Sequence, residues 1–524
     1  MAGDAKFSGR VDFGGQADEL ALSGTSSFSG TADFAGGAAA VTLSDKSAFS
    51  GRFVDSQNVA VALEGGTLDL ASPTTIASLE VGAKGIIIAT LSKEAGEGSA
   101  ITVGGNASFA DGAKLKLRLT NIAAAEGTYT VITAGSLTGA DDLVSDNTLV
   151  PFMYDAALAI EEAAGLVMVD IERKANEDLG LNRAQGAAYD ALYAALAEDD
   201  EVAGVFLGIT DKDLFRATVA QALPDHAGGA FEGLSLGMRT FARRLADGDG
   251  PIEATGKLRL TFEGAGWGSS KDEQESAGYD LDGLGFSGGA ELLTGIGRVG
   301  ASASWLWNRY DNGPENTVLS NTYEAALYWR GDWGAFSSFA RGSYGFTDFD
   351  GSRQFIGMNG EETLARTIER DWSGNVVSLM AGASVEGGSQ FFFFRPSVFV
   401  DYIRLDENGY DETGGGAALD LSVEDRTSDE LGLNLATALG FDLLGMRRGD
   451  DLWMRLEAEG GWREILAGEL GGTTARFGDG ESFTLLPDQS SSGWFARLRG
   501  QAGDEFYTVS GEFSVEERND KIGY

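Results

Sequence analysis

Apolar and polar side chains alternate along most of the second half of the chain, from about residue 257 onward. Such alternation is typical of β-strands, because successive side chains point to opposite faces of a sheet. Most of the runs reach the roughly 9–11 residues that a tilted strand needs to cross a bilayer. The pattern predicts eleven strands, at 257–267, 280–292, 298–309, 322–330, 334–346, 375–386, 390–404, 430–443, 451–462, 493–501 and 506–516.

Charged side chains indicate which face of these strands is enclosed. In the run 451–462, Leu456 and Trp462 lie on the face opposite to the charged residues. A basic residue on the lipid face costs about 2–4 kcal/mol at the bilayer centre, and an acidic residue somewhat less, so the charged face is assigned to the lumen of a barrel. A soluble β-sandwich would place its apolar core there instead. The residues predicted to face the lumen are Arg455, Glu457, Glu459, Arg497, Arg499 and Glu512.

The connections between the predicted strands alternate in length, as short periplasmic turns and long external loops do in outer-membrane barrels. Short connections are predicted at 331–333, 387–389 and 503–505, and long ones at 347–369, 405–429 and 463–492. Tryptophans near the strand ends fit the aromatic girdles of such barrels. Because bacterial barrels have an even number of strands, residues 522–524 are interpreted as the start of a truncated twelfth strand, with about ten further residues expected.

Between residues 179 and 245 the apolar residues recur at helical spacing. A first helix is predicted around Tyr189 and Leu196. A second is predicted to open on a capping box formed by Thr210 and Asp213 and to end before Pro224.

A third helix is predicted at 231–245, within the stretch 222–249 around which the rest of the chain is organised. At about 1.5 Å per residue it would be about 22 Å long, close to the roughly 25 Å height of the apolar band of a membrane barrel. We predict that it runs inside the barrel. The alternative is a helix between two soluble domains, with its arginines on a solvated face. The residues assigned to this pore helix are Met238, Arg239, Arg243 and Arg244.

The first 66 residues repeat with a period of 21, in which the triplet Phe7-Ser8-Gly9 recurs at Phe28 and at Phe49. Each repeat also carries a short alternating apolar run. A short fixed period with β-runs and glycine turns predicts a β-solenoid, in which each rung is buried by its neighbours. The alternative is a disordered Gly/Ser-rich tail. Residues 153–171 are predicted to form a hairpin that caps the solenoid.

Composition narrows the possible functions. The chain has 39 basic and 80 acidic residues and a net charge of −41, which argues against binding to nucleic acid. It has no cysteine and a single histidine, His226, so disulfides, histidine clusters and zinc sites with several histidines are excluded. The triplet at 24–26 is similar to a subtilisin nucleophile motif, but the repeats contain no histidine for a triad. No cofactor, metal site or catalytic residue is expected.

The start of the chain has no apolar signal core, and no apolar run reaches the length of a transmembrane helix.

The order of these segments resembles that of monomeric (type V) autotransporters of Gram-negative bacteria. The motifs that carry the resemblance are GTYTVITAGSLTG at 127–139, LNRAQGAAYDALYAAL at 181–196 and the barrel pattern that follows. The resemblance implies an all-β protein with a helical linker. Its expected parts are a β-solenoid passenger with its cap (residues 1–175), a helical linker and pore helix (176–250), and a twelve-stranded antiparallel transmembrane β-barrel (251–524).

The resemblance also implies a function. The barrel is expected to lie in the outer membrane and to export and anchor its own passenger, an adhesin or spacer at the cell surface. Its expected partners are outer-membrane lipid, the barrel assembly machinery and periplasmic chaperones, and the chain is expected to be monomeric and not an enzyme. The alternatives are the remnant of a surface enzyme whose catalytic domain lies upstream, and a porin-like channel with a periplasmic N-terminal domain.

One group of the autotransporters that this sequence resembles cleaves the passenger by means of an asparagine in the pore helix. Residues 222–249 contain no Asn, so this cleavage is not expected here. Asp225 or Asp247 could act in place of the asparagine, but both are interpreted as surface helix caps.

Overall fold

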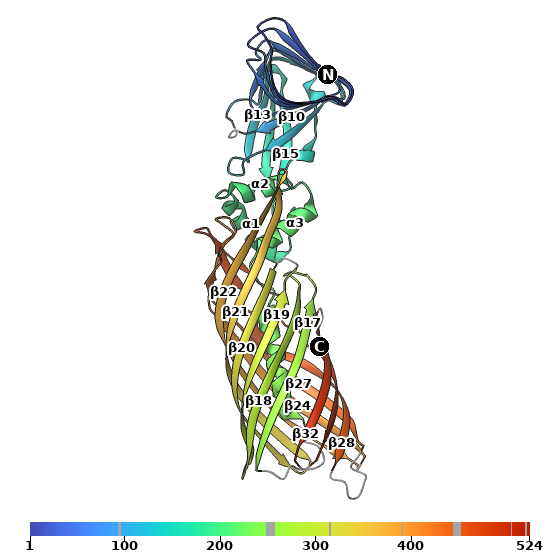
Figure 1. The fold of residues 1–524 in the computed structure, drawn as a ribbon, viewed down its shortest axis with the longest axis vertical. Coiled ribbons are helices and arrows are strands. Elements are labelled where there is room, and N and C mark those ends of the chain that lie inside the picture. Colours follow the sequence, from blue (N-terminus) through green and yellow to red (C-terminus); the bar gives the residue numbers. More distant parts are fainter. Residues whose placement is uncertain are drawn as a thin grey trace. The chain divides into compact units, whose positions relative to one another are not determined.

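A computed structural model describes residues 1–92, 96–247, 257–313, 316–389, 391–443, 452–504, 506–518 and 521–524. The chain forms two compact units (Figure 1). Unit 1 consists of Met1–Gly180, Leu196–Thr218 and Ile356–Leu364, and unit 2 of Leu181–Ala195, Val219–Phe355 and Ala365–Tyr524. The predicted boundary at residues 250–251 lies outside the described residues.

Unit 1 contains two sheets of parallel strands that alternate along the chain. One sheet contains β1 (Lys6–Asp12), β3 (Ser27–Asp33), β5 (Ala48–Val54), β7 (Thr67–Leu70), β10 (Ile86–Leu91), β12 (Lys114–Leu119) and β14 (Val144–Ser145). The other contains β2 (Asp18–Leu22), β4 (Ala39–Leu43), β6 (Val59–Leu63), β9 (Ser78–Val81), β11 (Ile101–Phe109), β13 (Gly127–Thr138) and, beside β11, β8 (Thr74–Ile76). The antiparallel hairpin of β15 (Tyr154–Glu161) and β16 (Leu166–Arg173) ends this second sheet.

The 21-residue period of the sequence appears as strand register. Phe7 pairs with Phe28, and Phe28 with Phe49, and their rings stack at 4.8 and 5.0 Å. Gly30 has φ +137°, and a Cβ there would lie 1.9 Å from the carbonyl oxygen of Gly9. The repeat therefore needs glycine at this position for both conformation and space. Parallel pairing of the repeats is established, and the solenoid itself stays a prediction.

Among the residues that the structure describes, four α-helices precede the barrel, where the sequence predicted three. They are α1 (Arg183–Leu196), α2 (Asp200–Gly208), α3 (Lys212–Gln221) and α4 (Gly229–Arg243). Short 3₁₀ turns cover Ala140–Asp142, Asn147–Leu149, Glu162–Ala164 and Arg244–Ala246. Among the described residues, no helix is both long enough and apolar enough to span a membrane.

Helix α2 was not predicted, and one detail of the helix prediction is wrong. The Asp199 side chain accepts a hydrogen bond from Val202 N at 3.3 Å and caps α2. The predicted capping box of Thr210 and Asp213 does not open α3. Instead, Asp211 accepts hydrogen bonds from Asp213 N at 3.0 Å and Leu214 N at 2.9 Å. Short acidic residues before a helix satisfy its free amide groups, which explains both caps.

Unit 2 is dominated by a closed antiparallel barrel. Its twelve strands are β17 (Leu258–Lys271), β18 (Tyr279–Thr294), β19 (Gly297–Asp311), β20 (Asn316–Trp333), β21 (Phe336–Asn359), β22 (Glu362–Val385), β24 (Phe392–Glu407), β27 (Arg426–Asp442), β28 (Trp453–Glu469), β31 (Gly493–Gly503), β32 (Thr508–Arg518) and β33 (Lys521–Gly523). The tip of the β21–β22 hairpin, Ile356–Leu364, belongs to unit 1. The barrel closes because β22 pairs with β24 and β33 pairs with both β17 and β32. Each of the eleven predicted strands overlaps one of these strands. Figure 1 shows the oblique strands, with the green α4 between the front and rear walls.

The predicted long loops are largely ordered strands. The prediction of a loop at 347–369 is wrong, because β21 and β22 continue to a turn at Gly360 and Glu361. Asp348 and Asp350 are exposed in this region, but the alternate residues Phe349 and Phe355 are buried, so the strand pattern continues. The other two predicted loops contribute a small antiparallel sheet of β25 (Tyr410–Asp411), β26 (Leu421–Val423), β29 (Thr473–Phe477) and β30 (Ser482–Leu485), and β23 (Gly387–Gly388) pairs with β24.

Candidate functional site: the barrel interior and its helix

Helix α4 lies within the barrel, and one of its faces is packed closely against the wall. Glycines recur every fourth residue at Gly229, Gly233 and Gly237, so they share one face of the helix. A Cβ at Gly237 would lie 2.5 Å from Leu306 Cδ2 and 2.6 Å from Trp267 Cζ2. The absence of side chains therefore allows the helix backbone to approach β17 and β19. This glycine row was not predicted, although its four-residue spacing is visible in the sequence.

The apolar side chains of α4 extend the contact. Leu234, Met238 and Phe241 are buried in a cluster with residues of the barrel strands. The ring of Phe241 meets that of Trp267 edge to face at 6.3 Å. Met238, predicted for the pore helix, therefore contributes to apolar packing.

Of the three predicted arginines of this segment, Arg239 and Arg243 contact a different set of barrel strands, whereas Arg244 contacts β17. Arg239 donates two hydrogen bonds to Glu516, at 3.2 and 3.1 Å. Arg243 forms an ion pair with Glu459 and lies 4.6 Å from the ring centre of Phe495. Arg244, just beyond α4, forms an ion pair with Glu263. Each of these arginines therefore has a glutamate as its partner. Such pairing offsets the cost of removing a charge from water.

The barrel residues predicted to face the lumen form a connected ionic network. Arg455 donates to Asp442 at 2.8 Å and to Glu386 at 3.0 Å, and Glu457 accepts from Arg395 at 3.0 Å. Further ion pairs join Arg497 to Glu459 at 2.9 Å, Arg497 to Glu512 at 3.2 Å and Arg499 to Glu457 at 3.4 Å. Glu512 remains 35% exposed, whereas the other five predicted residues are buried.

Asp247 and Asp225 are both buried, so the prediction that they are surface caps is wrong. Asp247 accepts from Arg497 at 3.0 Å and lies 3.3 Å from Arg499. Asp225 accepts from Arg426 at 2.9 Å. Each aspartate therefore joins the segment around α4 to the barrel through arginine. The sequence alone does not give this pairing, because it depends on register across the closed barrel.

The single histidine precedes α4, outside the barrel strands. His226 is buried, and its Nδ1 lies 2.8 Å from the carbonyl oxygen of Pro224. Burial lowers the pKa of His226, because the imidazolium form loses its hydration. The side chain of Lys271 is also buried and forms an ion pair with Asp488 at 2.7 Å. The hydroxyl group of Ser276 donates a hydrogen bond to the same carboxylate at 2.8 Å.

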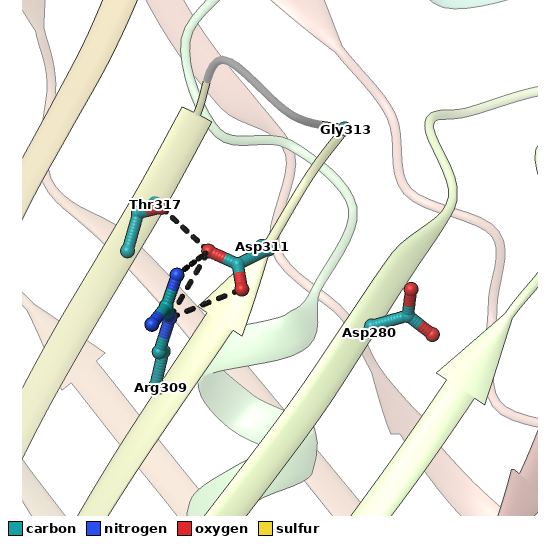
Figure 2. Close-up of a pocket in the computed structure, with 5 residues that line it drawn as sticks. All are labelled: Asp280, Arg309, Asp311, Gly313 and Thr317. Atoms are coloured by element: carbon teal, nitrogen blue, oxygen red, sulfur yellow. Dashed lines mark hydrogen bonds and ion pairs between the residues drawn. The ribbon is translucent and has the colours of Figure 1, made fainter.

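A polar depression of about 370 Å³ lies near the ends of β18, β19 and β20 (Figure 2). Among its described lining residues the basic side chain is Arg309, which is paired with Asp311 at 3.1 Å. Asp280 faces the same space, and Asp311 also accepts from Thr317. Because the arginine is already neutralised, the depression has little attraction for an anion. Within the described residues, no group of three or more His, Cys, Asp or Glu side chains is placed to hold a metal ion.

A closed antiparallel barrel with apolar residues outside, ion pairs inside and an enclosed helix defines a membrane β-barrel of the translocator class. Residues 263–503 match the family model for the autotransporter beta-domain, and this part of the chain is an autotransporter β-domain. The barrel therefore lies in the outer membrane. The resemblance stated from the sequence is confirmed for this region.

Relatives cover only part of the chain. Over 194 residues it is 26% identical to an esterase, EstA, of Pseudomonas aeruginosa and to one of Pseudomonas putida, a match to 36% of this chain and 29% of each relative. The chain thus spans less than a third of the length of these relatives. Among solved structures, the translocator domain of NalP from Neisseria meningitidis has 16% identity and a TM-score of 0.41, covering 56% of this chain and 94% of that one. The transport unit of AIDA-I from Escherichia coli has 11% identity and a TM-score of 0.32, covering 57% and 97%.

Proposed function

We propose that this chain is an outer-membrane translocator that supports export of its own N-terminal segment and anchors it at the cell surface. The main support is α4, which carries the chain through the barrel interior. Its glycine face fits the apolar wall, and its charged residues are paired with the opposite wall. A segment matched on both sides to the barrel is suited to hold an exported passenger.

The proposal includes partners and a role for the passenger. The barrel would use outer-membrane lipid as its solvent and would need the barrel assembly machinery and periplasmic chaperones to reach it. The protein would act as a monomer, because the barrel is complete within one chain. The passenger would act as an adhesin or spacer, and folding of its parallel sheets outside would oppose its return.

Surface proteolysis of intact cells tests the proposal. Added protease should remove epitopes within residues 1–170 and leave the barrel fragment protected. Lysed cells provide the control, because there the N-terminal epitope must be cleaved whatever its original side. Protection of residues 1–170 in intact cells, with cleavage after lysis, would contradict export.

A second candidate is a surface enzyme, favoured by the name of the EstA relatives. A histidine-dependent catalytic part would have to lie outside these 524 residues, because the only histidine of this chain is buried before α4. Cells producing the 524-residue chain should therefore not hydrolyse p-nitrophenyl esters above the empty-vector level. Hydrolysis that survives His226→Gln would favour the enzyme.

A further inference from the structure

The second sheet of unit 1 ends at the hairpin strand β15 within the part of the chain that the structure describes. Just after β16, the backbone N of Lys174 donates to the carbonyl oxygen of Met153 at 3.0 Å, so residue 153 faces β16. Backbone groups alternate sides along a strand, and those of Ala156 therefore face away from β16. The side chain of Asn147 donates to this carbonyl at 3.0 Å. We define this side of β15 as the open edge, which carries the backbone N–H and C=O groups of Ala156, Leu158 and Ile160.

The side chains at the open edge are apolar and only partly covered. Leu158 lies opposite Val169, and Ile160 lies opposite Val167, so these residues share one face of the sheet. Both valines are fully buried, whereas Leu158 and Ile160 are half-buried. Edge strands are commonly protected from the addition of a further strand by charged residues or proline, and the open edge has neither. A strand added beside β15 would cover the remaining apolar surface of both residues.

The opposite face of the same hairpin is acidic. Strand β15 carries Asp155 and Glu161 on this face, and β16 carries Asp170 and Glu172. Asp155 lies directly opposite Glu172, an arrangement of like charges that is unfavourable in a sheet. Lys174 lies 3.6 Å from Asp155 and neutralises one of the four carboxylates. A strand with basic residues on this face would offset the remaining repulsion.

We propose that the open edge of β15 binds an extended segment of a partner protein in which apolar and basic residues alternate. Backbone hydrogen bonds would supply affinity, and the alternating side chains would supply specificity, as in other cases of strand addition. A second copy of this chain fits poorly, because antiparallel pairing centred on Leu158 would place Asp155 opposite Glu161 of the other copy. The inference rests on unit 1 alone and does not depend on whether this segment is exported.

A synthetic peptide tests the site on the full chain in detergent micelles. The fluorescent probe is Lys-Leu-Lys-Leu-Arg-Leu, and the comparison peptide, Lys-Lys-Arg-Leu-Leu-Leu, has the same composition without the alternation. Empty micelles provide the blank. The alternating peptide should bind saturably and at least about tenfold more tightly than the comparison peptide, and it should slow amide hydrogen exchange in residues 154–161. Equal binding of both peptides, or binding without slower exchange in this strand, would overturn the proposal.

Two variants change the open edge in different ways. Leu158→Pro removes an outward N–H group, and proline is tolerated on an edge strand when its nitrogen faces away from the sheet. Asp155→Lys with Glu161→Lys reverses the charge at two exposed positions of β15. Each change should weaken binding of the alternating basic peptide at least about tenfold, and the charge reversal should favour Glu-Leu-Glu-Leu-Glu-Leu instead. If Leu158→Pro does not fold, the charge reversal decides alone, and an unchanged preference for the basic peptide would refute the site.

A matched control reverses two charges elsewhere on the same sheet. Glu19 of β2 and Glu80 of β9 are exposed and are separated from β15 by several strands. Glu19→Lys with Glu80→Lys changes the net charge by the same amount and should leave the affinity for the basic peptide unchanged. An equal loss in this control would mean that the peptide responds to overall charge, which would refute the site. Exchange in residues 154–161 that slows with protein concentration in the absence of peptide would show a second copy on the edge and would likewise overturn the assignment.

Discussion

The close approach of α4 to the barrel wall can be tested by adding one methyl group. Gly237→Ala would place its Cβ 2.5 Å from Leu306 Cδ2 and 2.6 Å from Trp267 Cζ2. A leucine methyl can move by rotation, but the indole is held by a hydrogen bond of 2.8 Å from its Nε1 to Asn308. The helix or the wall must therefore shift, and overpacking of this kind costs about 1–3 kcal/mol.

The expected loss must be separated from the gain in helix propensity. Alanine is favoured over glycine in a helix interior by about 1 kcal/mol. Gly186 of α1 provides the control, because a Cβ there would meet no atom within 4 Å. Gly186→Ala should show the gain alone. Relative to it, Gly237→Ala should be less stable by roughly 2 kcal/mol, up to about a thirtyfold change in the folding equilibrium.

The measurement is the urea midpoint of the folded barrel, followed by its electrophoretic mobility without heating. Comparison of the midpoints is valid when both variants keep the parental slope. If Gly237→Ala proved as stable as Gly186→Ala, α4 would not lie at the distance described, and the argument from its glycine face would be wrong.

Three further predictions concern a turn of the repeats, the ionic network and the histidine. Gly30→Ala should lower the thermal midpoint of the chain by an amount equivalent to about 1–3 kcal/mol, because its φ is +137° and its Cβ would meet a carbonyl oxygen, whereas Gly14→Ala should have little effect. Arg497→Gln removes one of the two arginine partners of each of the buried carboxylates Asp247 and Glu459 and should cost about 3–5 kcal/mol in urea unfolding. Arg404→Gln at an exposed pair should cost at most about 1 kcal/mol. Burial lowers the pKa of His226, so the unfolded chain is protonated at a higher pH than the folded chain, and the free energy of unfolding should fall as the pH drops below about 6.5. Urea midpoints measured between pH 5 and 8 should show this pH dependence, and His226→Gln should remove it.

The barrel could be predicted from the sequence because two independent signals agree along each strand. Alternation gave the strand period, and charges such as Glu457 and Arg497 marked one face. The ends of the strands were harder to predict. Beyond the apolar band the outward residues become polar, as at Asp348 and Asp350, and the pattern then looks like a loop. The inward residues stay buried there, and this becomes visible only when the strand is placed in the closed barrel.

The ionic pairs were not predictable for a different reason. Arg239 and Glu516 are 277 residues apart in the chain. Their meeting depends on the position of α4 along the barrel and on the register of all twelve strands. A shift of two residues between β28 and β31 would place Arg497 opposite Glu457 instead of Glu459, with the same local pattern. The sequence therefore predicts that the interior is charged, but not which charges meet.

The two faces of α4 together explain how one helix is fixed inside the barrel, with close apolar packing against β17 and β19 and ion pairs to β28 and β32. A rotation of the helix would turn its glycine row toward charged strands and its arginines toward Trp267 and Leu306. Both changes are unfavourable, since the first leaves space beside buried ions and the second buries a charge among apolar side chains. Close packing thus sets the distance of α4 from one wall, while the ion pairs set its rotation. The helix can leave this position only if both sets of contacts are lost together.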